Sequence, residues 1–370
     1  MAHNPEAVQL VAATLEHESD TSALGRLVAD GRLRPDEICA VTGKTEGNSP
    51  GESSRAAAIA AVRGFLAEHG GLSDERIGAI PMVFSSGGVG ILAPHVTIYT
   101  KRPWTGPVDR EPRLTVGTAK SVRIMPEWVG HAEMIEAVAD AVRAAARDAN
   151  IEPAQAEYVL TKSRGLQAED IEEARTRGIE LSPFPKGLAT PKTSGTTALG
   201  VAAAVDGLAI PPDEEIGTNL NLWTGKVSSS AGREDPEAQV ILLGNSTRAG
   251  GHLRVGHAVM NDVLDISSFI RAAEAAGLAD VCLTLTPEQR RRIVSVYVKI
   301  GTPVDARLRG RRQVHQEQNP GYMNELKAAV AGMFSAVLQD TVLYISSGAV
   351  HQGPAGGGTV AVIVDHSPDL

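Results

Sequence analysis

The sequence contains very little cysteine and few aromatic residues. Its two cysteines, Cys39 and Cys282, each lie inside a short apolar run, EICAV and DVCLTL. Neither belongs to a cluster with metal-ligand spacing, so we expect both to be small buried residues of a protein from a reducing compartment. Aromatic residues make up only 4% of the chain, whereas alanine and glycine are frequent. This composition predicts helices that pack closely on sheets.

Excess positive charge and long apolar segments are absent as well. The formal net charge of −9 provides no electrostatic footprint for nucleic acid or an anionic membrane. The basic runs at 290–292 and 307–312 are expected to be solvated surface. No segment reaches the roughly 18 apolar residues of a membrane span, and the opening MAHNPEAVQL does not have the pattern of a secretory signal. We therefore expect a cytoplasmic protein with no nucleic-acid or membrane partner.

Motifs of metal-dependent hydrolases and of nucleotide-binding proteins are also missing. The chain has ten histidines but no H-x-H or H-E-x-x-H pattern, which argues against zinc-dependent ring hydrolysis. The segment VTGKTEGN contains Gly-Lys-Thr, but no glycine stands five residues before Gly43 to complete a phosphate-binding loop. The glycine-rich segment at 351–358 leads into a strand, so it lacks the helix N-terminus that anchors phosphate. A nucleotide-binding module is therefore the weaker alternative.

The sequence does contain a threefold repetition of parts. Three times, an alanine- and leucine-bearing helix is followed by a strand, a second alanine-rich helix and two further strands. We place the units at 1–105, 112–250 and 256–370, with boundaries in the polar stretch 101–112 and the turn-rich stretch 245–256. The expected fold class is α/β, with three similar units arranged with pseudo-threefold symmetry around one central active site.

The same two residue types recur at matching places in each unit. Only nine lysines are present, yet one closes the first predicted strand of every unit, and a Ser-x-Gly sequence closes the next one. The lysines are Lys44, Lys162 and Lys299, and the serines are Ser85, Ser230 and Ser346. Equivalent positions on pseudo-symmetric units would converge on a common axis.

Converging lysines and serines are suited to acyl transfer. Ammonium groups that repel one another in a semi-buried cleft have lowered pKa values, and a neutral lysine can accept the proton of a serine hydroxyl. The glycine after each serine lets backbone N–H groups approach a developing oxyanion. A site of this kind suits a small flat ring that carries several carbonyl groups. His95 and His351 lie near the serine loops, where they could polarise the site or have surface or supporting roles.

Four segments of the chain resemble the cyanuric acid hydrolase and barbiturase family. They are GKTEGN at 43–48, SSGGVGILAPH at 85–95, ILLGNS at 241–246 and HQGPAGGG at 351–358. The resemblance spans essentially the whole chain. It implies a ring-opening amidohydrolase with three α/β repeats around one active site, assembled as a homo-oligomer, which we expect to be a homotetramer.

The resemblance also implies roles for individual residues. Ser230 would be the nucleophile and Lys162 the base that activates it. The remaining lysines and serines, together with their neighbours, would bind the substrate. These binding residues are Lys44, Lys299, Ser85, Ser86, Ala231, Ser346 and Ser347.

A departure from the family pattern bears on the substrate. Cyanuric acid hydrolases have an arginine at the start of the second helix of each unit, and here only Arg55 matches it. An ungapped comparison places Ser194 and Asn324 at the other two positions, and Lys327 one turn later keeps some positive charge. Three guanidinium groups suit a fully symmetric triazine, so their partial loss favours a pyrimidine ureide such as barbituric acid, opened to ureidomalonate. Cyanuric acid, another cyclic imide, or non-catalytic binding of a ring compound are the alternatives.

A second departure concerns metal. Family members can hold a structural cation with a glutamate two residues after the third lysine, where this chain has Gly301. Without the carboxylate, a divalent cation should bind more weakly. We therefore expect no cofactor to be required for catalysis, although backbone carbonyls remain as candidate ligands. These belong to Ala349, Gln352, Gly353, Pro354 and Gly357.

Overall fold

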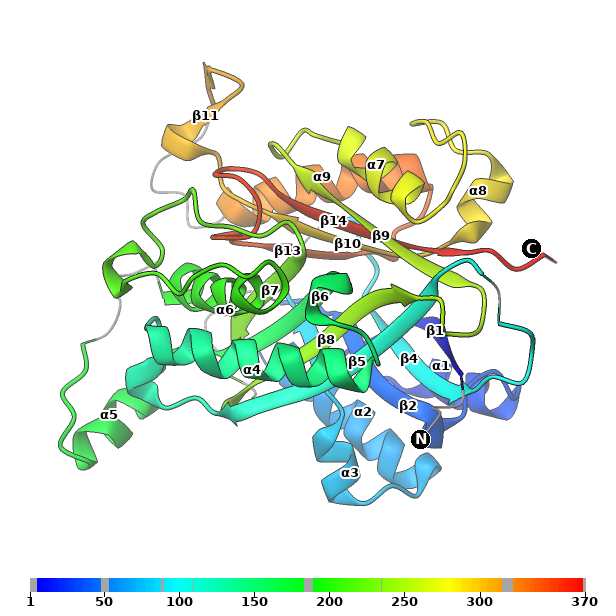
Figure 1. Cartoon of the computed structure of the whole chain (residues 1–370), viewed down its shortest axis with the longest axis horizontal. Coiled ribbons are helices and arrows are strands. Elements are labelled where there is room, and N and C mark those ends of the chain that lie inside the picture. Colours follow the sequence, from blue (N-terminus) through cyan, green and yellow to red (C-terminus); the bar gives the residue numbers. More distant parts are fainter. Residues whose placement is uncertain are drawn as a thin grey trace.

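Three sheets of identical strand order make up the mixed α/β fold of the chain (Figure 1). The computed structural model describes residues 5–47, 53–87, 90–108, 110–182, 189–233, 235–314 and 322–368, without the side chains of 189 and 190. The motif residues Asn48, Gly88 and Val89 lie outside these ranges. No helix of the described ranges is long and apolar enough to cross a membrane.

Each sheet has four strands. The first sheet has the order β1 (Glu6–Thr14), β4 (His95–Pro103), β2 (Ile38–Lys44), β3 (Met82–Ser85). The second has the order β5 (Arg113–Arg123), β8 (Glu237–Ser246), β6 (Ala156–Arg164), β7 (Val227–Gly232). The third has the order β9 (Leu253–Met260), β14 (Gly358–Asp365), β10 (Ile293–Ile300), β13 (Tyr344–Ser347). The repetition predicted from the sequence is therefore present as three similar sheets.

The first strand of each sheet is not part of the repeat predicted from the sequence. That repeat begins with a helix, whereas β1, β5 and β9 each precede that helix along the chain. These strands lie at the edges of their sheets and contain buried, partly exposed and, in β1 and β5, exposed residues in irregular order. The third sheet accordingly begins at Leu253, inside the stretch 245–256 that we interpreted as a boundary.

Helices connect the strands and cover the outer face of each sheet (Figure 1). Strands that end in lysine and serine run parallel, so a crossover is required between them. The crossovers contain α2 (Ser54–Gly70), α6 (Ala189–Val205) and α9 (Tyr322–Leu338). The helices before the lysine strands are α1 (Ser22–Ala29), α4 (Ala132–Asp148) and α7 (Ser267–Ala275). Shorter elements are α3 (Asp74–Ala79), α5 (Ala168–Thr176), α8 (Pro287–Arg292), and the hairpin of β11 (Arg307–Leu308) and β12 (Arg311–Arg312).

Small residues allow the close packing of helices on sheets that the composition predicts. A Cβ atom at Gly117 of β5 would lie 1.8 Å from the carbonyl oxygen of Ala145 in α4. At the matching place in β9, a Cβ at Gly256 would lie 2.3 Å from the backbone nitrogen of Ala276, directly after α7. Both glycines therefore let a helix backbone approach the sheet closely.

The hydrophobic core has separate outer parts and one shared inner part. Three clusters each fill the space between one sheet and its helices. A fourth lies between the sheets and includes Tyr99 of β4, Tyr158 of β6, and Tyr297 and Tyr344 of the third sheet. Cys39 belongs to this inner cluster, as predicted, whereas Cys282 is exposed and the prediction that it is buried is wrong. The segment around Cys282 lies before α8 and forms no strand, and the thiol donates to the carbonyl of Thr284 at 3.1 Å on the surface.

Candidate active site

In all three sheets the repeated lysine and serine face each other across parallel strands. Register partners are Lys44 and Ser85, Lys162 and Ser230, and Lys299 and Ser346. Side chains of directly neighbouring strand positions project from the same face of a sheet. The sequence repetition thus corresponds to three copies of one local geometry.

A cleft of about 540 Å³ contains most of the predicted site residues. Residues from all three sheets line it: Arg55, Ser85, Ser86, Lys162, Ser230, Ala231, Asn324, Lys327, Ser346 and Ser347. The sequence reasoning missed several other lining residues, among them Gln167, Arg233 and Met323. Of these, Arg233 directly follows the second Ser-x-Gly turn, and this adjacency is a sequence signal that could have identified it as a lining residue.

Three predicted binding residues lie behind the wall of this cleft. Lys44 is 2% exposed, Lys299 0% and Ser194 1%, and none of them lines the cleft. The Ser194 hydroxyl donates to the carbonyl of Pro191 at 3.2 Å. Lys44 donates to the carbonyl of Gly87 at 3.1 Å. These side chains therefore contact backbone carbonyl groups near the cleft and do not face the cleft themselves.

Two of the three lysines hold the serine strand of another sheet. Lys162 Nζ donates to the carbonyl of Phe84 at 3.2 Å, and Lys299 Nζ donates to that of Ser229 at 2.5 Å. Each acceptor precedes the serine of the neighbouring sheet. Because β3 and β7 are edge strands, their outward carbonyls need partners from outside their own sheet. The three sheets are thus joined at the residues that lead into the serines.

The three serines differ in their hydrogen bonds. The Ser85 hydroxyl donates to the carbonyl of Ile345 at 2.9 Å. Ser346 Oγ accepts from Lys299 Nζ at 3.2 Å. Ser230 Oγ is buried and makes no hydrogen bond of normal geometry among the described residues, although it lies close enough to the Tyr344 hydroxyl to act on the pKa of that phenol. Of the three, Ser230 is thus the serine whose hydroxyl is least engaged within the described chain.

Two lysines near the cleft have lowered pKa values. Burial, followed by the charges of Lys162 and Lys327, holds the pKa of Lys299 well below its usual range. Burial and the charge of Arg55 lower the pKa of Lys327 to about 8. Desolvation and like charges both disfavour an ammonium ion. Basic side chains are therefore crowded in this part of the site, and the crowding makes the ammonium forms of Lys299 and Lys327 easier to deprotonate.

The two histidines near the serine loops have structural partners. His95 Nδ1 lies 2.9 Å from the carbonyl of Ala93, and His351 Nδ1 lies 2.5 Å from that of Leu222. Burial lowers the pKa of both rings. Neither histidine lines the cleft, so both have the supporting position considered for them from the sequence.

The glycine-rich loop before β14 does not fit a divalent cation well. Gly301 donates its N–H to the carbonyl of Gly357 at 2.6 Å, and Gly357 donates to that of Pro354 at 2.8 Å. A Cβ at Gly301 would lie 2.7 Å from the Gly357 oxygen, which leaves no room for a carboxylate-bearing side chain there. The described ranges contain no group of three or more His, Cys, Asp or Glu residues arranged to hold a metal. Divalent cations prefer carboxylate ligands, so no catalytic step is assigned to one.

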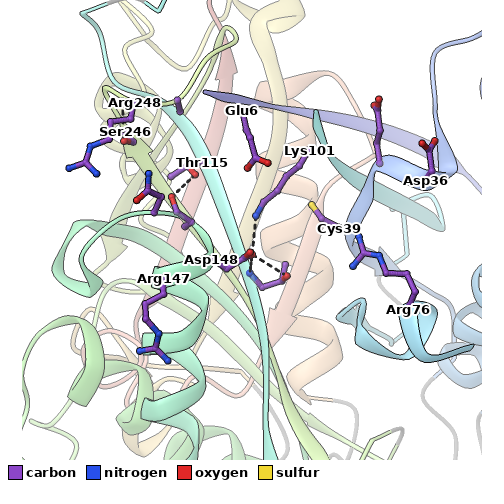
Figure 2. Close-up of a pocket in the computed structure, with 15 residues that line it drawn as sticks. Glu6, Asp36, Cys39, Arg76, Lys101, Thr115, Arg147, Asp148, Ser246 and Arg248 are labelled. Carbon is purple, nitrogen blue, oxygen red and sulfur yellow. Dashed lines mark hydrogen bonds and ion pairs between the residues drawn. The ribbon is translucent and has the colours of Figure 1, made fainter. Parts of the chain in front are cut away.

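A larger cavity of about 730 Å³ lies between the first and second sheets and contains none of the predicted site residues (Figure 2). Lys101 and Asp148 form an ion pair of 2.9 Å in it, and Asp148 also accepts the N–H of Thr118. Its lining includes Cys39, and burial raises the pKa of this thiol to about 12, which makes it unreactive. Acidic and basic side chains are mixed in this cavity, in contrast to the serine- and cation-lined cleft.

The fold and the cleft define a hydrolase built on three similar sheets, and comparison with known proteins identifies its class. A family model described as amidohydrolase ring-opening protein matches residues 9–365. The chain belongs to this family and is an amidohydrolase that acts on the C–N bonds of cyclic amides.

Relatives with different named activities are similar to this chain. It is 37% identical over 358 residues to Barbiturase 2 of Nocardioides sp. (strain ATCC BAA-499 / JS614), covering 95% of this chain and 96% of the relative. It is 35% identical over 355 residues to a cyanuric acid amidohydrolase of Bradyrhizobium diazoefficiens, covering 93% and 94%. A solved cyanuric acid hydrolase superposes with a TM-score of 0.90 at 31% identity, over 98% of this chain and 100% of that chain.

Proposed function

We propose that this amidohydrolase opens a cyclic ureide ring with Ser230 as nucleophile and Lys162 as base. The observation that supports this assignment is the difference among the three serines. Ser85 and Ser346 are engaged in hydrogen bonds, whereas the Ser230 hydroxyl makes none of normal geometry in the described chain and has the Tyr344 hydroxyl as its polar neighbour. A nucleophile has to be available to the substrate, and a binding serine is better held in place. We further propose that the three units are arranged with pseudo-threefold symmetry around this cleft.

The proposed reaction proceeds through an acyl-enzyme. The Ser230 oxygen attacks a ring carbonyl while Lys162 accepts the hydroxyl proton. The tetrahedral intermediate collapses by breaking the ring C–N bond, and the ammonium of Lys162 returns the proton to the leaving nitrogen. Lys162 then takes a proton from water, which attacks the ester on Ser230. The acyl C–O bond breaks, Lys162 returns this proton to the Ser230 oxygen, and the product leaves as a carboxylic acid. Ser85 and Ser346 would hold the other carbonyls of the ring.

Barbituric acid is the proposed substrate because the three positions that hold arginine in cyanuric acid hydrolases are not equivalent here, and only Arg55 and Lys327 bring cationic groups to Ser86. Arg55 Nη1 donates to Ser86 Oγ at 2.5 Å, and Lys327 Nζ donates to the Ser86 carbonyl at 3.3 Å. Ser194, which stands at the arginine position of the second unit, is buried away from the cleft. An uneven distribution of donors suits a ring whose edges differ. Cyanuric acid remains the second candidate, because a relative so named is 35% identical.

The test compares alanine variants of the three serines on both acids. Ser230→Ala is expected to lower kcat by at least about 10³-fold, since losing a catalytic serine removes the covalent route. Ser85→Ala and Ser346→Ala are expected to raise KM about tenfold and to keep measurable turnover. Ring opening is followed by loss of ultraviolet absorbance for barbituric acid and by chromatography for cyanuric acid. Full activity of Ser230→Ala would disprove the assignment, and a higher kcat/KM for cyanuric acid would reverse the order of substrates.

Three expectations from the sequence are kept as part of the proposal. The enzyme requires no cofactor, it assembles as a homotetramer, and it acts in the cytoplasm. Turnover after exhaustive dialysis against a chelator, with metal content measured on the same sample, tests the first. Light scattering coupled to size-exclusion chromatography measures the number of subunits.

A further inference from the structure

The glycine-rich loop of the third unit contacts the segment that leads into the nucleophile strand of the second. The N–H of Thr224 donates to the carbonyl of His351 at 3.2 Å, and the N–H of Gly353 donates to the carbonyl of Thr224 at 3.0 Å. His351 Nε2 also accepts the N–H of Gly217 at 2.8 Å. Because Thr224 lies three residues before the start of β7, the loop holds the segment that leads into the strand carrying Ser230.

Gln352 extends this contact to the residue next to Ser230. Its side chain is completely buried, and its Oε1 accepts the N–H of Ser229 at 2.6 Å. The carbonyl of the same Ser229 accepts from Lys299 Nζ at 2.5 Å. Since β7 is the edge strand of its sheet, this side of Ser229 has no strand partner. Two side chains of the third unit therefore hold both backbone groups of Ser229.

The backbone on either side of Gln352 is tightly constrained. His351 has a φ of +59° and Gly353 a φ of +90°. A Cβ at position 353 would lie 2.5 Å from the carbonyl oxygen of Gly358, so only glycine fits there. The conformation of this loop aims the Gln352 side chain at β7.

We infer that Gln352 is a positioning residue that sets the placement of Ser230 through the N–H of Ser229. This inference rests on the proposed function of Ser230. A buried N–H without an acceptor is unfavourable, so the strand would shift to satisfy it if the acceptor were removed. Displacing a reacting atom by about 1 Å can reduce the rate roughly 100-fold. The signature loop of the third unit thus contributes to catalysis without touching the substrate.

The chain offers a matched control in the first sheet. Gln239 of β8 is 2% exposed, and its Oε1 accepts the N–H of Met82 at 2.5 Å. Met82 lies in β3, the edge strand that carries Ser85. The two glutamines therefore make the same kind of bond to equivalent edge strands, although Gln352 binds the residue directly before the proposed nucleophile and Gln239 binds the residue three before the binding serine Ser85.

The experiment measures kcat and KM separately for Gln352→Met, Gln352→Glu and Gln239→Met in the full-length enzyme. Gln352→Met keeps the size of the side chain but has no acceptor, and it is expected to lower kcat about 10- to 100-fold with KM changed less than threefold. Gln352→Glu keeps an acceptor and should retain kcat within about fivefold. Gln239→Met should act mainly on KM. Circular dichroism and thermal melting confirm that each variant is folded.

The outcomes separate this inference from the assignment of Ser230. Unchanged kcat in folded Gln352→Met, with Ser230→Ala inactive, overturns the positioning role and leaves the nucleophile assignment intact. Equal losses of kcat in the two methionine variants also overturn it, because a general packing defect would produce them. If Gln352→Met does not fold, Gln352→Glu decides: retained kcat supports the role of the acceptor, and a 100-fold loss in a folded protein contradicts it.

Discussion

At the scale of single residues, Lys327 combines a buried position with a positive charge. Its side chain is 4% exposed and contacts the Ser86 carbonyl in the wall of the cleft. Burial and Arg55 lower its pKa to about 8, so the folded protein releases this proton more readily than the unfolded chain does. Between that pH and the ordinary lysine pKa of about 10.4, the unfolded chain binds more protons, and the free energy of unfolding rises with pH.

Lys327 should therefore make substrate binding pH-dependent. Its ammonium is lost as the pH rises through about 8, and KM is expected to increase over the same interval. Lys327→Met should raise KM at pH 7 by roughly 10- to 100-fold, as expected for loss of a charged hydrogen bond, and should flatten the dependence of KM on pH.

The same variant should raise the free energy of unfolding at pH 7 by at most about 3 kcal/mol, because it removes a buried charge. KM measured from pH 6 to 9 checks the effect on binding, and urea denaturation checks the effect on stability. An unchanged dependence of KM on pH would contradict the role of Lys327 in substrate binding.

At the scale of elements, glycine positions decide how closely helices approach their sheets. Gly117 lies in β5 beneath α4, where an added Cβ would meet the Ala145 carbonyl oxygen at 1.8 Å. Gly332 lies inside α9, and no atom lies within 4 Å of an added Cβ. A substitution at Gly117 therefore reports the steric cost of an added Cβ, and a substitution at Gly332 reports the intrinsic helix propensity of the new residue.

Alanine at these two positions should change stability in opposite directions. Gly117→Ala forces α4 away from the sheet and is expected to destabilise the protein by about 1–3 kcal/mol or more. Gly332→Ala is expected to stabilise it by about 0.5–1 kcal/mol, since alanine is the better helix former. Urea denaturation of both variants under the same conditions measures the difference. Destabilisation of similar size in both variants would show that the close approach of α4 to Gly117 does not cause the loss of stability.

The strands that contain the repeated lysine or Ser-x-Gly sequence could be predicted from the sequence, and the strands that contain neither could not all be predicted. The lysine and Ser-x-Gly positions identified two strands per unit, and the structure pairs them in register. The strands β1, β5 and β9 have mixed edge-strand patterns that do not stand out from turn-rich sequence. The contact between Gln352 and Ser229 depends on how one unit packs on another, which a comparison of units does not contain.

At the scale of the whole molecule, the three sheets share one interior. The inner cluster joins side chains of all three sheets, and the cleft is lined by residues of all three. Side chains also cross between sheets at each joint, as with Lys162 and Phe84 or Ser85 and Ile345. The joint between the first and third sheets has no direct chain connection, unlike the other two. It is held by non-covalent contacts.

The positions of Glu6 and His366 have a consequence for the order of the units along the chain. The carbonyl of Glu6 accepts the N–H of Gly250 at 2.8 Å, and the N–H of His366 donates to the carbonyl of His252 at 2.9 Å. Both segments therefore lie beside the same short connection between β8 and β9, and one cavity borders both Ala7 and Asp365. A circular permutant that joins residue 368 to residue 5 through a short glycine-serine linker, and is opened at 247–249, should fold and retain kcat within about tenfold. Activity and melting temperature of the purified permutant test this, and an inactive or unfolded product would show that the existing connectivity is required.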